Sequence, residues 1–344
     1  MAINQQHIAE KLNISVATVS RSLKNDLSIS AQTRAMVLEA ARRMGYNTPS
    51  AFRAKASADE MAPICALIQS DREVRHGSLE ETMVPGVLSG MSNAIAKYGS
   101  SLIVHYVPLK DRDRACDPQV LPPLVRNGNV SGIVLIHYYP KEVASKLAEN
   151  YLCTSIIHDY RLPNVDIANI NQAGAINCQV DKLYYHKHRN IGFMGQMKIN
   201  SYSRARCAAY LESMLAHGMP FQSDHIFDIS EGLSDDLMSA IIGKIKNGMT
   251  AVVCENDHWG YLFMSKLQQS GLRVPQDVSI TGYDSEAVPP GLVKLHSAIL
   301  PSMYLGAAAV ELLHDRLEQP AAPAKQTVFD CSVVDGDSII ENNR

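Results

Sequence analysis

The chain lacks any uninterrupted apolar run of about 18 residues, and no leader-like apolar run lies between Met1 and Leu12. A membrane-spanning helix needs the first feature and a secretory leader needs the second. The seven cysteines are an odd number and form no CxxC pair, a usage typical of a reducing compartment. We therefore expect a cytoplasmic protein with no membrane partner.

The usual motifs of enzyme chemistry are also missing. Neither a GxGxxG nor a GK[ST] phosphate loop occurs, and no serine lies in a GxSxG turn. The acidic pairs Glu80–Glu81 and Asp235–Asp236 are explained by favourable interactions with helix dipoles. His186 and His188, two residues apart on a helix, point in different directions. The sequence therefore predicts no enzyme, no cofactor and no metal site.

The basic side chains are concentrated at the start of the chain. The 344 residues carry a net charge of −3, but residues 1–58 carry +5 and the remainder carries −8. A phosphate backbone rewards local rather than total positive charge. Because the length allows two or three domains, we expect a small basic head that meets a polyanion and a larger acidic body.

Three short helices are expected in this head. Asn4 can cap the first, and Asn13 tolerates the left-handed backbone of a tight corner. A second helix follows over Ser15–Leu23, and a third runs from the cap Ser30 to Gly45, a residue suited to end a helix. Two short helices joined by a turn of three or four residues form the helix-turn-helix arrangement, whose second helix fits the major groove of DNA.

The outer face of the second helix is small, polar and basic. Arg21 can donate two hydrogen bonds to guanine, Val16 and Ala17 can contact thymine methyl groups, and the hydroxyl side chains can reach phosphates. The predicted DNA contacts are Ser15, Val16, Ala17, Thr18, Ser20 and Arg21. Any amphipathic three-helix bundle has a polar outer face, so composition alone leaves DNA binding and a purely structural bundle equally open.

From Pro63 onward, short β-rich runs alternate with helical stretches. Such alternation predicts parallel sheets covered by helices on both faces. The predicted strands are Ile64–Ile68, Leu102–Val107, Gly132–Ile136, Thr154–Ile157, Ile191–Met194, Ala251–Cys254 and Val278–Thr281. This number of strands over about 280 residues is better divided between two sheets than placed in one. The expected fold is therefore an all-α helix-turn-helix head on an α/β body of two doubly wound lobes.

Three proline-containing breaks are expected to carry the chain between the lobes, at 161–164, 289–291 and 320–323. Two lobes joined in this way form a hinged clamshell, like that of the periplasmic binding proteins. In doubly wound sheets, ligands bind beyond the carboxyl ends of the strands. The residues just past the predicted strand ends are Gln69, Ser70, Asp71, Tyr106, His137, Tyr138, His158, Asp159, Asn256, Asp257 and Asp284. Carboxylates, amides and aromatic faces suit a sugar or a nucleoside.

The head closely resembles that of the lac repressor family of bacterial transcription regulators. The resemblance is carried by Ile8–Leu12, Val16–Arg21, Thr33–Arg34 and Gly45–Tyr46. It implies that Val16 and Ala17 help set the operator sequence and that Arg21 contacts bases. It also implies a hinge helix after Tyr46 that enters the minor groove.

The body resembles the same family over about residues 62–335. The motifs are Val130–Val134, His188–Phe193, Asn256–Asp257, Gly271–Ser279 and Gly282–Asp284. The resemblance implies that Arg206, Asn256 and Asp284, and also Asp159, hold the effector. For Asn256, Asp159 and Asp284 this agrees with their positions after predicted strands. Tyr138 and Asp257 are added as effector contacts from their strand-end positions.

The chain departs from the family pattern in the hinge and in the pocket. Ala56 stands where a leucine usually wedges between base pairs, and an alanine wedges poorly. Phe52 could replace the leucine or only pack, and Phe52, Arg53 and Ala56 are the expected hinge residues. The departures in the body are Met83 and Val84 for an aromatic pair, Ala209 for a glycine and Leu300 for a glutamine. Trp259, the only tryptophan, could stack on a ligand or pack in the core.

These observations predict a repressor with DNA-binding residues 1–46, a hinge at 47–61 and an effector-binding, dimerising body over 62–344. The expected lobes cover about 62–160 with 292–320, and about 164–288 with 324–344. A homodimer is expected because one recognition helix covers too few base pairs, whereas a dimer reads a pseudo-palindrome. The alternatives are a body that dimerises without a ligand, a small-metabolite enzyme and a carbohydrate-binding transport protein.

Overall fold

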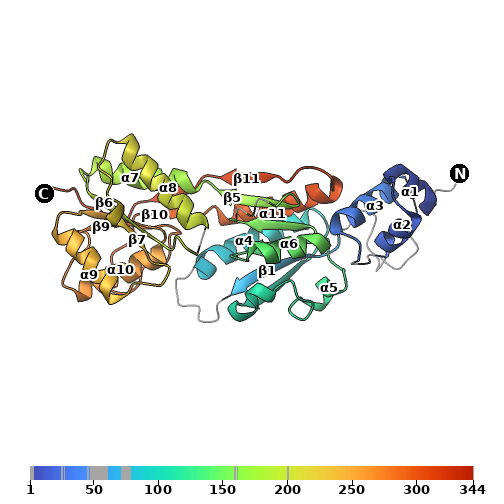
Figure 1. Ribbon diagram of the computed structural model, residues 1–344, viewed down its shortest axis with the longest axis horizontal. Coiled ribbons are helices and arrows are strands. Elements are labelled where there is room, and N and C mark those ends of the chain that lie inside the picture. The colour runs from blue at the N-terminus through green and yellow to red at the C-terminus, as the bar shows by residue number, and fades with distance from the viewer. Residues whose placement is uncertain are drawn as a thin grey trace. The chain divides into compact units, whose positions relative to one another are not determined.

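The computed structural model describes residues 4–24, 26, 28–44, 46, 61–70, 79–158, 160, 162–199 and 201–343 (Figure 1). The chain divides into two compact units. The first unit contains Met1–Glu73, Gly86–Asn169 and Met303–Thr327, and the second contains Val74–Pro85, Ile170–Ser302 and Val328–Arg344.

The head of the first unit is a bundle of three helices, α1 (Gln5–Leu12), α2 (Val16–Leu23) and α3 (Ala31–Arg43). The predicted caps are confirmed, because Asn4 Oδ1 accepts from the amide of His7 at 3.0 Å and Ser15 Oγ accepts from that of Thr18 at 3.0 Å. Asn13 has the expected left-handed backbone, with φ 52°. The three helices bury Ile8, Val19 and Val37 against one another. Gly45 lies outside the described residues.

The rest of the first unit is built on a six-stranded sheet of order β11-β5-β4-β3-β1-β2. Its strands are β1 (Ile64–Ser70), β2 (Leu102–Pro108), β3 (Gly132–Ile136), β4 (Cys153–Ile156), β5 (Val165–Ile170) and β11 (Gln326–Phe329). Strands β2, β1, β3, β4 and β5 pair in parallel. The helical elements are α4 (Leu79–Ala96), η1 (Leu109–Arg114), α5 (Pro123–Arg126), α6 (Lys141–Asn150) and α11 (Ser302–Glu318). Helix α6 packs Val143, Ala144 and Leu147 against Ile133 and Leu135 of β3 in a single core.

The second unit contains a four-stranded parallel sheet of order β7-β6-β8-β9. Its strands are β6 (Ile191–Gly195), β7 (Ile226–Asp228), β8 (Ala251–Cys254) and β9 (Ser279–Thr281), and β10 (Ser297–Ile299) pairs antiparallel with β12 (Ser332–Val334). The helical elements are α7 (Gln172–Tyr185), α8 (Ser201–Ala216), η2 (Ser223–His225), α9 (Asp235–Lys246) and α10 (Asp257–Gln269). Strands β8 and β9 are buried throughout, and β8 is also apolar throughout, as a strand covered on both faces requires. In β9 the buried hydroxyl of Thr281 donates to Gln179 Oε1 at 2.9 Å.

The chain leaves the first unit later than the predicted break at 161–164. That break is followed by β5, which pairs with β4 in the first sheet, and the units change after Asn169. The run was missed as a strand because Asp166 interrupts its apolar pattern. In the fold, Arg316 neutralises the buried carboxylate of Asp166 with two hydrogen bonds of 2.9 and 2.7 Å. The changes of unit after Ser302 and Thr327 are likewise later than the predicted breaks at 289–291 and 320–323, and the short segment Val74–Pro85, which no predicted break marks, also belongs to the second unit.

Within the described part of the chain, no helix combines the length and the apolar character needed to cross a bilayer.

Candidate functional site

The outer face of α2 carries the residues predicted to read DNA. Val16 is 44% exposed, and Ala17 and Arg21 are also exposed, whereas Val19 and Leu23 are buried in the bundle. Helical periodicity produces this division, because residues three and four apart share a face. The structure therefore presents Val16, Ala17 and Arg21 together to solvent.

The hydroxyl residues of this segment are partly engaged in holding the helix. Ser15 Oγ caps α2 and also shares a hydrogen bond of 2.8 Å with Thr18 Oγ1. Ser20 is half-buried. A hydroxyl that caps a helix keeps a lone pair or a proton for a phosphate oxygen, so capping and phosphate contact are compatible. The hinge residues Phe52, Arg53 and Ala56 lie outside the described residues, as does Asp159.

Arg206, on α8 in the second unit, is buried and held on several sides. Its Nε donates to Gln172 Oε1 at 2.8 Å, and its Nη1 donates to the carbonyl oxygen of Glu255. Its Nη2 lies 3.9 Å from Asp284 Oδ1. The guanidinium also lies over the ring of Tyr283, with Cζ 3.5 Å from the ring centroid. These contacts fix the plane of the guanidinium and direct the Nη2 edge towards Asp284.

Asp284 follows β9 and is buried, with a left-handed backbone at φ 101°. Burial raises the pKa of Asp284 to about 6, and the neighbouring Arg206 opposes that rise. The 3.9 Å separation from Arg206 Nη2 is longer than a hydrogen bond. The Nη2 donor of Arg206 and the Oδ1 acceptor of Asp284 therefore face each other without a direct hydrogen bond.

Asn256 and Asp257 lie at the start of α10, and both have structural partners. Asn256 Oδ1 caps the helix by accepting from the amide of Trp259 at 3.0 Å. Asp257 Oδ1 accepts from Ser297 Oγ at 2.7 Å, and its Oδ2 accepts from the amide of Glu286 at 2.8 Å. Burial, with a contribution from Asp284, raises the pKa of Asp257 to about 8.

Trp259 is half-buried and packs against the hydrophobic core of the second unit. Its ring also meets that of His258 edge-on, with centroids 5.4 Å apart. This placement matches the packing alternative for Trp259.

Sequence reasoning missed Glu255, a fully buried carboxyl beside Arg206. Its Oε2 accepts from Ser203 Oγ and from the amide of Gln196, the latter at 3.0 Å. Its Oε1 has no hydrogen-bond partner among the residues that the structure describes. Burial raises the pKa of Glu255. Its position directly after Cys254 could have identified Glu255 as a site residue, because the strand-end rule that selected Asn256 applies equally to Glu255.

A second set of predicted residues lies in the first unit, past β3 and β4. The rings of Tyr138 and His158 lie 5.3 Å apart, and His158 stacks on Tyr160 at 4.0 Å. The guanidinium of Arg112 lies 5.2 Å from the Tyr138 ring centroid. His137 has φ 70°, and burial lowers its pKa to about 4. These residues form a ladder of aromatic rings with a cation at one end.

The four positions that depart from the family pattern are all buried, namely Met83, Val84, Ala209 and Leu300.

Two family profiles match this chain. Residues 6–49 match the bacterial regulatory proteins of the lacI family, and residues 180–339 match the periplasmic binding protein-like domain. The transcriptional repressor CytR of Escherichia coli K12 is 22% identical over 346 residues, covering 97% of this chain and 95% of that protein. The repressor PurR of Pasteurella multocida is 23% identical, covering 91% of each chain.

Solved structures have the same fold. The transcriptional regulator CelR in complex with cellobiose has a TM-score of 0.67 at 18% identity, covering 98% of this chain and 99% of that one. The lac repressor dimer bound to operator has a TM-score of 0.62 at 20% identity, covering 99% and 100%. A helix-turn-helix head joined to such an α/β body defines a DNA-binding transcription regulator. The chain thus combines a head that matches the lacI family of bacterial regulatory proteins with a periplasmic binding protein-like domain, and its relatives are transcriptional repressors.

Proposed function

We propose that the protein is a homodimeric repressor whose affinity for a pseudo-palindromic operator is set by a small sugar or sugar derivative. The proposal that a ligand binds is based on Arg206 Nη2 and Asp284 Oδ1, which face each other in the second unit. Residues 1–46 bind DNA, residues 47–61 form the hinge, and residues 62–344 bind the effector and dimerise. The protein acts in the cytoplasm and performs no chemistry on its ligand.

The DNA-reading part rests on the exposed face of α2. Arg21 reads a guanine, Val16 and Ala17 contact neighbouring bases, and Ser15, Thr18 and Ser20 reach phosphates. One such helix covers only a few base pairs, so two copies related by a two-fold axis supply the specificity. The hinge residues Phe52, Arg53 and Ala56 add minor-groove contacts.

The ligand class follows from the chemistry of the second unit. A sugar hydroxyl both donates and accepts, so it can bridge a guanidinium N–H and a carboxylate oxygen 3.9 Å apart. Asn256 and Asp257, from the start of α10, add polar groups in the same unit, and Tyr138 and Asp159 are the further effector contacts predicted from the sequence. Relatives of the same fold bind cellobiose in one case and glucose in another, which supports a carbohydrate here.

Control of DNA binding follows from linkage. A ligand that binds two arrangements of the body with different affinities shifts the population between them. If only one arrangement spaces the two heads correctly for the operator, DNA must change the ligand affinity by the same factor. An inducing sugar and a corepressor would use the same residues. Whether the ligand weakens or strengthens operator binding is therefore measured in the operator assay.

The alternative is a body that dimerises without any ligand. It is favoured by one observation, namely that Arg206 already has protein partners at Nε and Nη1 and a ring beneath it. In a body that binds no ligand, the protein itself must supply the partners of the buried Arg206 charge.

A thermal shift of the full chain against pentoses, hexoses, uronic acids, disaccharides and nucleosides separates the two proposals. A ligand at 100 times its dissociation constant adds about 2.7 kcal/mol to the free energy of unfolding. A sugar that raises the melting temperature and changes operator affinity supports the effector proposal. A flat panel with intact operator binding supports the ligand-free body.

A further inference from the structure

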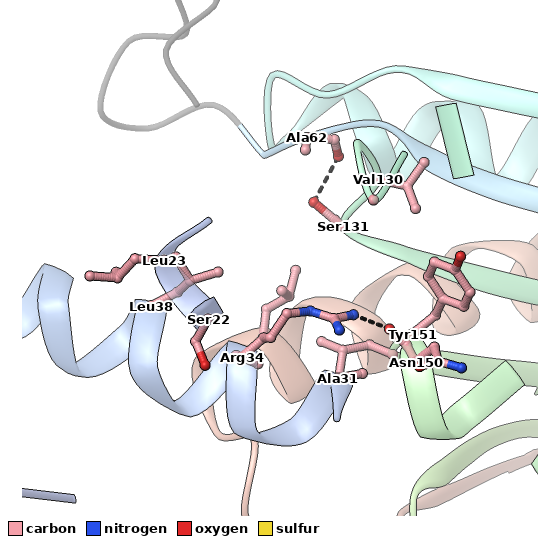
Figure 2. A pocket seen from close by; sticks show the side chains of 14 residues that line it. Ser22, Leu23, Ala31, Arg34, Leu38, Ala62, Val130, Ser131, Asn150 and Tyr151 are labelled. Carbon is pink, nitrogen blue, oxygen red and sulfur yellow. Dashed lines mark hydrogen bonds between the residues drawn. The ribbon is translucent and has the colours of Figure 1, made fainter. Parts of the chain in front are cut away.

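The head of the first unit is docked directly on the body of that unit through Arg34 of α3. This side chain is only 5% exposed. Its Nη1 donates to two carbonyl oxygens of the head itself, those of Asp26, at 3.2 Å, and Ile29. Its Nη2 donates to the carbonyl oxygen of Asn150, the last residue of α6, as Figure 2 shows. Helix ends leave such carbonyls without intrahelical partners, so α6 offers a ready acceptor.

A second bond joins the head to the segment that follows α11. Gln32 Nε2 donates to the carbonyl oxygen of Pro320 at 3.2 Å. That segment is held in place by Arg316, which donates to the carbonyl oxygens of Ala322 and Pro323 as well as to Asp166. The head is therefore attached to two rigid points of the body, the end of α6 and the anchored segment at Pro320.

The apolar part of the contact is poorly filled. A cavity of about 170 Å³, partly open to solvent, lies between head and body (Figure 2), and its lining includes Leu23, Ala31 and Ala35 of the head and Val130, Leu152 and Leu317 of the body. The apolar side chains on its two sides do not pack against each other across this space. Because little apolar packing holds the two parts together, the hydrogen bonds of Arg34 and Gln32 account for much of the attachment. Such a contact can be made and broken at modest cost.

Docking leaves the DNA-reading face free. Val16, Ala17 and Arg21 are exposed, whereas Ser22 and Leu23, the last two residues of α2, are buried and line the cavity. The docked head can therefore still meet DNA.

We propose that Arg34 and Gln32 form a latch that holds the DNA-binding head on the body in its DNA-competent position. The role in DNA binding rests on the function proposed above, whereas the docking itself does not. A shift of the end of α6, or of the segment at Pro320, reaches the head through this latch and not only through the covalent connection. A released head must be ordered again on binding DNA, and that entropic cost weakens the complex.

Two variants of the full chain change the latch in opposite directions. Gln32→Ala removes the bond to Pro320 and leaves the hydrogen bonds of Arg34 in place. Ala35→Leu fills part of the 170 Å³ cavity, which has room for the added carbons, since a void of about 150 Å³ holds a benzene ring. Gln6→Ala is the matched control, because the Gln6 amide donates to Glu10, a bond that lies within the head. Arg34 itself is avoided, because its loss would also disturb the head.

The direct measurement is amide hydrogen exchange of a body peptide over residues 147–153, which none of these variants alters. Gln32→Ala is expected to speed its exchange and weaken operator binding by about twofold to tenfold, the range set by one net hydrogen bond. Ala35→Leu should slow exchange and tighten binding, and Gln6→Ala should change neither. Equal exchange in all four proteins would overturn the latch. Altered exchange with unaltered operator affinity would overturn its role in DNA binding, and failure of the unaltered protein to bind any operator would count against the proposed function alone.

Discussion

The guanidinium of Arg206 lies over the ring of Tyr283, with Cζ 3.5 Å from the ring centroid. The ring covers one face of the cation, so the hydrogen-bond donors of Arg206 point outward from the edge of the guanidinium. One edge is bound by Gln172 and by the Glu255 carbonyl, and the other faces Asp284. Tyr283 therefore helps to direct the donor that we assign to the effector.

The first prediction concerns the reading of DNA by Arg21. Arg21→Ala should weaken binding to the specific operator by about 1 to 3 kcal/mol, because a bidentate contact with guanine is lost, and should weaken random DNA far less. Fluorescence anisotropy titrations with both DNAs at one salt concentration measure the difference. An equal loss on both DNAs would mean that Arg21 contacts only phosphate.

The second prediction concerns the response to the effector. Asp284→Asn should abolish the ligand-induced rise in melting temperature, because the amide presents a donor where the carboxylate accepts. Operator affinity without ligand should stay within about twofold, since Asp284 belongs to the second unit and the head belongs to the first. Asp224→Asn, at an exposed carboxylate of the same unit that pairs with Lys244, is the control. Loss of operator binding in Asp284→Asn alone would indicate a structural role.

The third prediction is a dependence of stability on pH. The folded-state pKa of Asp257 is raised from 3.8 to about 8, so the fold keeps a proton that the unfolded chain has released. The free energy of unfolding should therefore decrease as the pH rises to about 8. Buried histidines such as His137 and His188, whose pKa values are lowered to about 4, oppose this trend only below about pH 6.5.

The comparison with Asp257→Asn isolates the effect of Asp257, because buried cysteines such as Cys65, whose thiol pKa burial raises to about 12, also destabilise the fold as the pH rises above about 8. Urea unfolding of the full chain at pH 7, 8 and 9 measures it, and Asp257→Asn should flatten the slope while lowering stability at pH 7. A stability that increases across this window in the unaltered protein would contradict the assignment.

The fourth prediction concerns the buried pair of Asp166 and Arg316. Asp166→Asn should lower the free energy of unfolding by about 3 to 5 kcal/mol, because Arg316 would keep a buried charge without its partner. The exposed pair of Asp315 and Lys325 lies nearby in the same unit, and Asp315→Asn should cost only about 0 to 1 kcal/mol. Urea unfolding compares the two variants, and similar losses would show that burial of the pair matters little.

The fifth prediction concerns the crossing of α4 and α11. A Cβ added at Gly90 would lie 1.9 Å from the carbonyl oxygen of Met303, and one at Gly306 would lie 2.0 Å from that of Val87. Either alanine must push two helix backbones apart, so each should lower the melting temperature. Gly243→Ala in α9 meets nothing within 4 Å and should stabilise its helix by about 1 kcal/mol. Thermal unfolding of the three variants tests this, and a gain at Gly90 would contradict the close packing.

Much of the fold was predictable because its signals are local. The caps Asn4 and Ser15 accept hydrogen bonds from amides three residues away. Strands β1 and β3 each contain a continuous apolar run, Ile64–Ile68 and Ile133–Ile136. The strand β5 was not predictable in this way. Its buried Asp166 is tolerated only because Arg316, 150 residues later, supplies the opposite charge.

The sequence also selected part of the candidate site. Asn256 and Asp284 follow predicted strands, and the resemblance to the lac repressor family added Arg206. Neither the strand-end rule nor the family resemblance indicated that Glu255 is fully buried beside Arg206. Nor did they indicate that the side-chain oxygen of Asn256 caps α10. Such facts depend on which side chains the fold brings into contact.

The sequence by itself determined the basic helix-turn-helix head, the alternating α/β body and the face of α2 that carries Arg21, because hydrogen bonding and periodicity within a few residues govern each. Tertiary structure alone decided where the chain changes unit, how the charge of Arg206 is satisfied, and that Arg34 bonds to the end of α6, 116 residues away. Burial and pairing of charges over such separations depend on the arrangement of whole elements. No local pattern in the sequence contains that information.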